Sequence, residues 1–133
     1  MKGLKTVLWV CGGCFLLGFT GLVAPWPWLV RMFEMYGVAP PVVGPLEAYM
    51  IRMLAALIGI VGVFFLVLAL HPERYAPMVF LAATGLILFC VFTLAGGIHY
   101  RFPARVFLPD TLFLGTTGTL ILVLAVKAFK KGV

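Results

Sequence analysis

Two charged residues interrupt the apolar stretches of this 133-residue chain, and their types allow specific chemistry. Arg52 and Asp110 each lie in a run of apolar residues. A lone charge at the centre of a lipid bilayer costs about 2.5–3.5 kcal/mol on insertion scales, so such groups usually face protein and have a partner. We therefore expect Arg52 and Asp110 to lie together, with Glu47 one helical turn away and with His99 or Arg101 from the nearby loop.

Such a polar cluster has three interpretations. It is a buried ion pair that fixes the register of two helices, or it is the floor of a binding pocket for a lipid headgroup, a quinone or a small anion. In the third interpretation the charged groups extend separately toward water. The sequence leaves all three open.

Cysteine spacing offers a second candidate for chemistry. Cys11 and Cys14 are separated by two glycines, which is the spacing of thiol oxidoreductases. Both lie inside an apolar run, where burial favours the neutral and unreactive thiol. Cys90 is a third thiol without further metal ligands nearby in the sequence. We interpret these cysteines as small packing residues, and we expect no metal site, no catalytic residues and no enzymatic activity.

Four long apolar runs must position these residues, and each has about the ~20 residues that a helix needs to cross a bilayer. The chain is 64% hydrophobic and 11% charged, whereas soluble domains carry roughly 25% charged residues. The runs predict a single-domain, all-α integral membrane protein, an up-down bundle of four transmembrane helices at about 4–24, 46–70, 76–98 and 107–128. We expect the first run to be a retained helix rather than a cleaved signal peptide.

The loop after the first run is predicted to contain a short helix at about 28–36 that lies in the membrane interface. Pro25 and Pro27 are expected to end the preceding helix, because proline lacks the amide donor. Arg31 and Glu34 are three residues apart and share one face, while apolar and aromatic residues cover the rest. Gly37 is placed to end this helix. The alternative is an irregular loop with interfacial aromatic residues.

The distribution of the net charge of +6 predicts the orientation. Six basic residues and one acidic residue fall on the side of the two termini, against four basic and three acidic residues on the other side. The positive-inside rule then places both termini in the cytoplasm, and we expect a bacterial inner membrane. The basic ends would contact anionic lipid headgroups, and we expect no nucleic-acid partner.

Small residues mark the second and fourth runs. They lie at helical spacing beside Arg52 in the second run and recur every four residues in the fourth run. Small residues allow membrane helices to approach closely, so we expect helix packing at Ala48, Ala55, Ala56, Gly59, Gly62, Thr111, Gly115 and Thr119. The first and third runs are plainer. The short turn after Leu70 predicts that the second and third helices are antiparallel neighbours. Specific chemistry is expected between the second and fourth helices, in the outer leaflet.

The chain resembles the DoxX-like group of small four-helix membrane proteins. The resemblance rests on the proline-tryptophan pairs after the first run, on Arg52 followed by small residues through Gly59 and Gly62, on a short proline-containing turn and on two further plain helices. It implies a four-helix bundle and a connection to quinones or to redox complexes. It carries over no catalytic residue.

The expected function is that of a non-enzymatic accessory or structural subunit of a larger membrane protein assembly. Its partners would be membrane lipid and other membrane protein subunits or further copies of the chain. The first alternative is a quinone- or lipid-binding protein associated with a redox complex, holding its ligand near Arg52 and Asp110. The second alternative is a small transporter.

Overall fold

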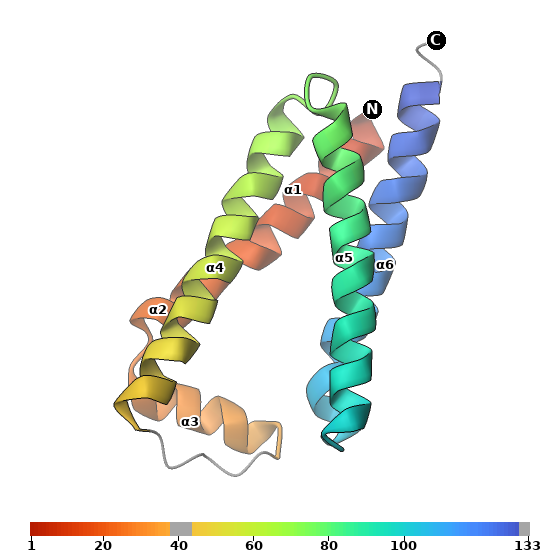
Figure 1. Cartoon of the computed structure of the whole chain (residues 1–133). Helices are drawn as coiled ribbons and strands as arrows, with labels where there is room; N and C mark the ends of the chain where they lie inside the picture. Colours follow the sequence, from red (N-terminus) through yellow and green to blue (C-terminus); the bar gives the residue numbers. More distant parts are fainter. Residues whose placement is uncertain (38–43, 131–133) are drawn as a thin grey trace.

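The computed structural model describes residues 1–37 and 44–130, which form helices connected by short turns (Figure 1). The helices are α1 (Lys2–Leu16), α2 (Gly18–Val23), α3 (Trp26–Met35), α4 (Pro45–Leu70), α5 (Ala76–His99) and α6 (Ala104–Lys130). Four spans are long and apolar enough to cross a membrane, with α1 and α2 together forming the first. The predicted all-α membrane bundle is confirmed.

The first span ends where proline blocks it. Ala24 caps α2 in an extended conformation, as the steric demand of the following Pro25 favours. Pro27 does not end this helix as predicted, because it lies in the first turn of α3, where a missing amide is tolerated. Gly37 follows α3 with a φ of 72°, and its amide donates to Glu34. The predicted short helix is therefore confirmed, starting two residues earlier.

The fourth span begins three residues earlier than predicted, at Ala104. Pro109 consequently lies in the helix interior rather than in its first turn, and it cannot donate to the carbonyl four residues earlier, at Arg105. The turn before α6 is tight. The amide of Arg101 donates to Ile98 and that of Phe102 donates to Gly97, a pattern that closes the end of α5. Arg101 occupies the left-handed position of this turn, with a φ of 53°.

The helices pack in two pairs, and this arrangement corrects two predictions. The α1–α2 span packs along α4, and α5 packs along α6. Figure 1 shows α4 and α5 diverging from their shared turn, so they are antiparallel but not packed as neighbours along their length. The expectation that α4 and α6 face each other is also wrong, because each packs on a different partner.

Glycines bring the helices of each pair into close contact. A Cβ on Gly62 of α4 would lie 2.6 Å from the backbone nitrogen of Leu16 and 2.9 Å from the carbonyl oxygen of Gly12. In the other pair, a Cβ on Gly118 of α6 would lie 3.1 Å from the carbonyl oxygen of Ala83. Gly62 of α4 and Gly118 of α6 therefore serve packing within the chain, and Gly12 on the first span takes part as well.

The predicted ridge on α6 has a different register in the structure. The buried residues of α6 are Thr111, Leu114, Gly118, Ile121 and Ala125. Thr111 is therefore confirmed as a buried position, and Gly115 contacts α5, where its Cβ would lie 3.1 Å from the sulfur of Cys90. Thr119 is exposed. A four-residue spacing drifts around a helix that has 3.6 residues per turn, so the third residue of the ridge leaves the interface.

The core lies toward one end of the bundle. It joins side chains of α1, α4, α5 and α6, among them Leu8, Leu68, Val79 and Ile121. Both termini and the α4–α5 turn lie at this end (Figure 1), which we call the terminal end. At the opposite end α3 lies across the bundle (Figure 1), and we call it the α3 end.

Candidate functional site

Arg52 lies at the α3 end and contacts the last turn of the first span. Its guanidinium donates hydrogen bonds to the carbonyl oxygens of Leu22 and Ala24, the latter at 3.4 Å. The final carbonyls of a helix lack intrahelical partners and carry partial negative charge, so a half-buried arginine is well matched to them. Arg52 thus joins α4 to the end of α2, and within the described residues it does not form the predicted ion pair with Asp110.

Glu47 has a separate role in the first turn of α4. The negative charge is favourable there, near the partial positive end of the helix. Its carboxylate folds back over Gly44, where a Cβ would lie 2.6 Å from the Oε2 atom. In the described part of the chain, Glu47 therefore lies over Gly44 and does not join Arg52 and Asp110 as predicted.

His99 and Arg101 belong to the turn between α5 and α6. The ring of His99 packs edge-on against Tyr100, with centroids 5.0 Å apart. Arg101 adopts the left-handed conformation, which is strained for a residue with a Cβ and directs Phe102 back toward the bundle. The structure therefore distributes the five predicted cluster residues over several places at the α3 end.

Asp110 lines a pocket of about 450 Å³ between α3 and the start of α6. We call it the α3 pocket; its lining consists of Met32, Phe33, Tyr36, Phe102, Val106, Pro109 and Asp110. Asp110 is the one charged side chain among these described lining residues. Three aromatic rings, a flexible methionine and a carboxylate thus surround one space, the mostly apolar lining with few polar groups that is typical of small-molecule sites.

A second, larger space lies on the other side of Met32. This α2–α3 groove measures about 740 Å³ and runs between α2, α3 and α4, along Gly21, Trp28, Leu29 and Ile58. Met32 lines both spaces, so the groove and the α3 pocket lie next to each other.

Helix α3 is what the sequence reasoning missed about this site. Phe33 and Tyr36 were assigned to the lipid-facing side of an interfacial helix, but the structure places them opposite α6. The guanidinium of Arg105 on α6 reaches Gly37 after α3, so the two helices are in contact here. The available signal was the clustering of aromatic residues on both sides of the polar turn, at 33–36 and 100–102.

The three cysteines are separate free thiols in the part of the chain that the structure describes. Cys11, Cys14 and Cys90 are free, with Cys11 buried and Cys14 exposed. The thiol of Cys90 donates to the carbonyl oxygen of Thr111 at 3.3 Å, linking α5 to α6. Within the described residues no three histidine, cysteine or acidic side chains gather closely enough to hold a metal ion.

The chain was also compared with known proteins. No family model, no curated protein and no solved structure matches it. The DoxX-like resemblance therefore stays a prediction from sequence patterns.

Proposed function

We propose that this protein binds an amphipathic membrane lipid, with the headgroup in the α3 pocket and the chains in the α2–α3 groove. The observation that carries the proposal is the α3 pocket itself, which Asp110 lines together with Phe33, Tyr36 and Phe102. This is the lipid half of the expectation that a quinone or lipid is held near Arg52 and Asp110. The ligand site differs from that expectation, since Arg52 is engaged with backbone carbonyls.

The chemistry of the pocket favours a headgroup that carries an amine. A carboxylate accepts hydrogen bonds from an ammonium group, and aromatic faces attract cations. A quinone ring presents carbonyl oxygens, which need donors, and the lining offers the hydroxyl of Tyr36 as its side-chain donor when Asp110 is ionised. We therefore place an amine lipid ahead of a quinone.

The test is the lipid that co-purifies with the protein. The full chain is purified in a mild detergent, and its bound lipids are extracted and identified by mass spectrometry. We expect enrichment of an amine lipid over the bulk membrane composition. Enriched quinone in its place would support the quinone alternative, and an extract with the bulk composition would contradict a binding function.

Asp110→Asn removes the charge and preserves the shape of the side chain. A hydrogen bond to a charged group contributes about 1.5–3 kcal/mol, and Asp110 is exposed, so we expect about a tenfold loss of amine-lipid affinity. Glu34→Gln is the matched control, because Glu34 is an exposed carboxylate on α3 that does not line the pocket. Equal affinities of the two variants would refute the role of Asp110.

An accessory subunit of a larger assembly is the second candidate, and one observation favours it. Where α4 and α5 diverge, an apolar groove of about 400 Å³ runs between them, along Leu57, Val61, Gly85 and Phe89. A transmembrane helix of another subunit can pack there. The glycines of the small-residue ridges do not support this function, because they pack against helices of the same chain. Disulfide trapping from Gly85→Cys tests it: crosslinks to another membrane protein would support a subunit.

We also propose that both termini face the cytoplasm of a bacterium. Lys2, Lys5, Arg74, Lys127 and Lys130 lie at the terminal end, and Glu73 is the one acidic residue there. Retention of basic residues on the cytoplasmic side orients such helices. Reporter fusions to the C-terminus test the orientation.

A further inference from the structure

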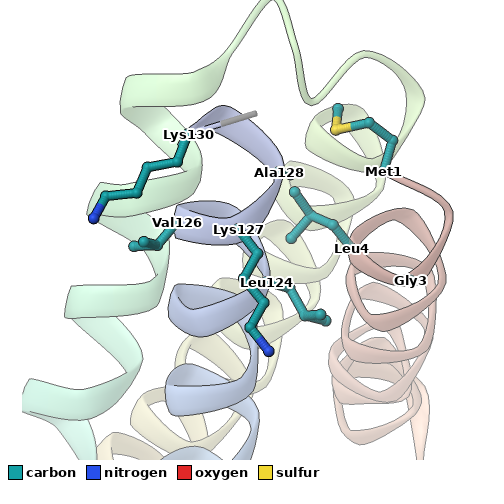
Figure 2. A pocket seen from close by; sticks show the side chains of 8 residues that line it. All are labelled: Met1, Gly3, Leu4, Leu124, Val126, Lys127, Ala128 and Lys130. Carbon is teal, nitrogen blue, oxygen red and sulfur yellow. The ribbon is translucent and has the colours of Figure 1, made fainter. Parts of the chain in front are cut away.

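The terminal end has a crevice that the proposed function does not use. It lies between the first turn of α1 and the last turns of α6 and measures about 880 Å³. Figure 2 shows Leu4 pointing from α1 toward α6 and Leu124 pointing from α6 toward α1. The floor of this crevice is apolar, whereas its α6 side carries Lys127 and Lys130.

The charges around this crevice are unbalanced. Lys127 and Lys130 are exposed in the last turn of α6, and Lys2 and Lys5 lie on the adjoining first turn of α1. Three of the four acidic residues of the chain lie at the α3 end, and the fourth, Glu73, lies in the α4–α5 turn and does not line the crevice. The lining of the crevice therefore carries two lysines and no carboxylate among the described residues, with two more lysines on the neighbouring turn of α1.

The position of the crevice matches the depth of lipid phosphates. Its residues lie at the ends of two membrane spans, Lys2–Val23 and Ala104–Lys130. Leu4 is 1% exposed and belongs to the core, so the crevice passes from a closed apolar interior to a basic rim. Basic pockets between transmembrane helices bind the headgroups of anionic lipids, with acyl chains against the apolar walls.

We propose that this crevice binds an anionic phospholipid, with its phosphate at Lys127 and an acyl chain along Leu4 and Leu124. Figure 2 shows the two lysines diverging, with Lys130 extending away from α1. Lys127 is thus the nearer cation, with its side chain beside Leu124, and Lys130 lies at the outer edge of the crevice. This site is independent of the α3 pocket, which lies at the other end of the bundle.

The experiment titrates the purified full chain in a neutral detergent with phosphatidylglycerol and measures bound lipid by native mass spectrometry. Phosphatidylcholine with the same acyl chains tests the headgroup charge, and glycerol phosphate without chains tests the apolar wall. We expect phosphatidylglycerol to bind most tightly of the three. Equal binding of phosphatidylcholine, or equally tight binding of glycerol phosphate, would overturn the proposal.

Two variants separate a crevice from a general surface charge. Lys127→Gln should weaken phosphatidylglycerol binding about fivefold, the effect expected of one basic residue at a membrane surface. The matched control is Arg74→Gln, which removes one exposed charge from the same end without lining the crevice, and it should change the affinity less than about twofold. Equal losses in both variants would show that only the surface potential matters.

Gly3→Phe tests the shape of the crevice at constant charge. A Cβ on Gly3 meets only Leu124, at an ordinary 3.9 Å, so the ring can be accommodated by filling the space that the acyl chain would use. We expect weaker phosphatidylglycerol binding with an unchanged unfolding transition. Unchanged lipid binding in this variant would contradict the proposed position of the chain.

Discussion

Gly62 is the position where one methyl group should disturb the bundle most. Its Cβ would lie 2.6 Å from the backbone nitrogen of Leu16, and 2.9 Å from two further backbone atoms of α1. Backbone cannot rotate away as a side chain can, so α1 and α4 must separate by about 0.8 Å to reach the 3.4 Å of ordinary contact. A gap of 0.5–1 Å forfeits about a quarter to a half of the dispersion attraction of the atoms concerned.

Overpacking of this kind typically costs about 1–3 kcal/mol, and we expect Gly62→Ala to fall near the upper end, at about 2–3 kcal/mol. The matched control is Gly13→Ala on α1, where an added Cβ meets nothing within 4 Å. Both variants gain the same helix propensity, up to about 1 kcal/mol on the scale measured in water, so the control should be neutral or slightly stabilised.

The assay is reversible unfolding by sodium dodecyl sulfate in mixed micelles, followed by circular dichroism. Gly59→Ala provides a second comparison in the same helix pair, because its Cβ would meet the ring of Phe19, at 2.5 Å, rather than backbone atoms. A ring can move, so we expect a smaller loss than for Gly62→Ala. If Gly62→Ala is as stable as Gly13→Ala, the α1–α4 packing through glycines is refuted.

Two further predictions concern the α3 end. Arg52→Met leaves the carbonyls of Leu22 and Ala24 without their donor and should lower the free energy of unfolding by about 1–3 kcal/mol. Arg52→Lys should recover part of this loss. Equal stability of Arg52→Met and the parent protein would refute the role of Arg52 in capping α2. Arg101→Gly should stabilise the chain by about 1 kcal/mol in the same assay, because glycine adopts a φ of 53° without a Cβ penalty, and Arg101→Val should destabilise it; a destabilised glycine variant would contradict the left-handed turn.

Much of the fold could be predicted because a bilayer restricts it. A span must satisfy its backbone hydrogen bonds internally, so apolar length alone specifies helices. The spans were predicted in this way, and the short helix near 28–36 was predicted from its pattern of charged and apolar residues; the observed boundaries differ by a few residues. Proline positions were predicted less well. Pro27 lies in the first turn of α3, where proline is tolerated, and Pro109 lies in the interior of α6 because that helix already begins at Ala104.

The candidate site could be predicted only in part. Asp110 was singled out as an ionisable residue at a span end, and it does line a pocket. The prediction that Arg52 is the partner of Asp110 was wrong, because two residues at the same depth in the membrane can point in different directions from their helices. A backbone carbonyl accepts hydrogen bonds from a guanidinium as a carboxylate does, and the sequence offers no pattern that shows which of the two Arg52 will reach.

By itself, the sequence determined that the protein lies in a membrane, how many spans it has, and that its two ends differ in charge. These properties depend on composition and length, which act on each segment separately. Only the tertiary structure decided which helices pair, that the glycines of α4 meet Gly12 and Leu16, and that α3 approaches α6 around Asp110. Helix pairing in lipid depends on the fit of surfaces rather than on hydrophobicity, and that fit exists only once the backbones are in contact.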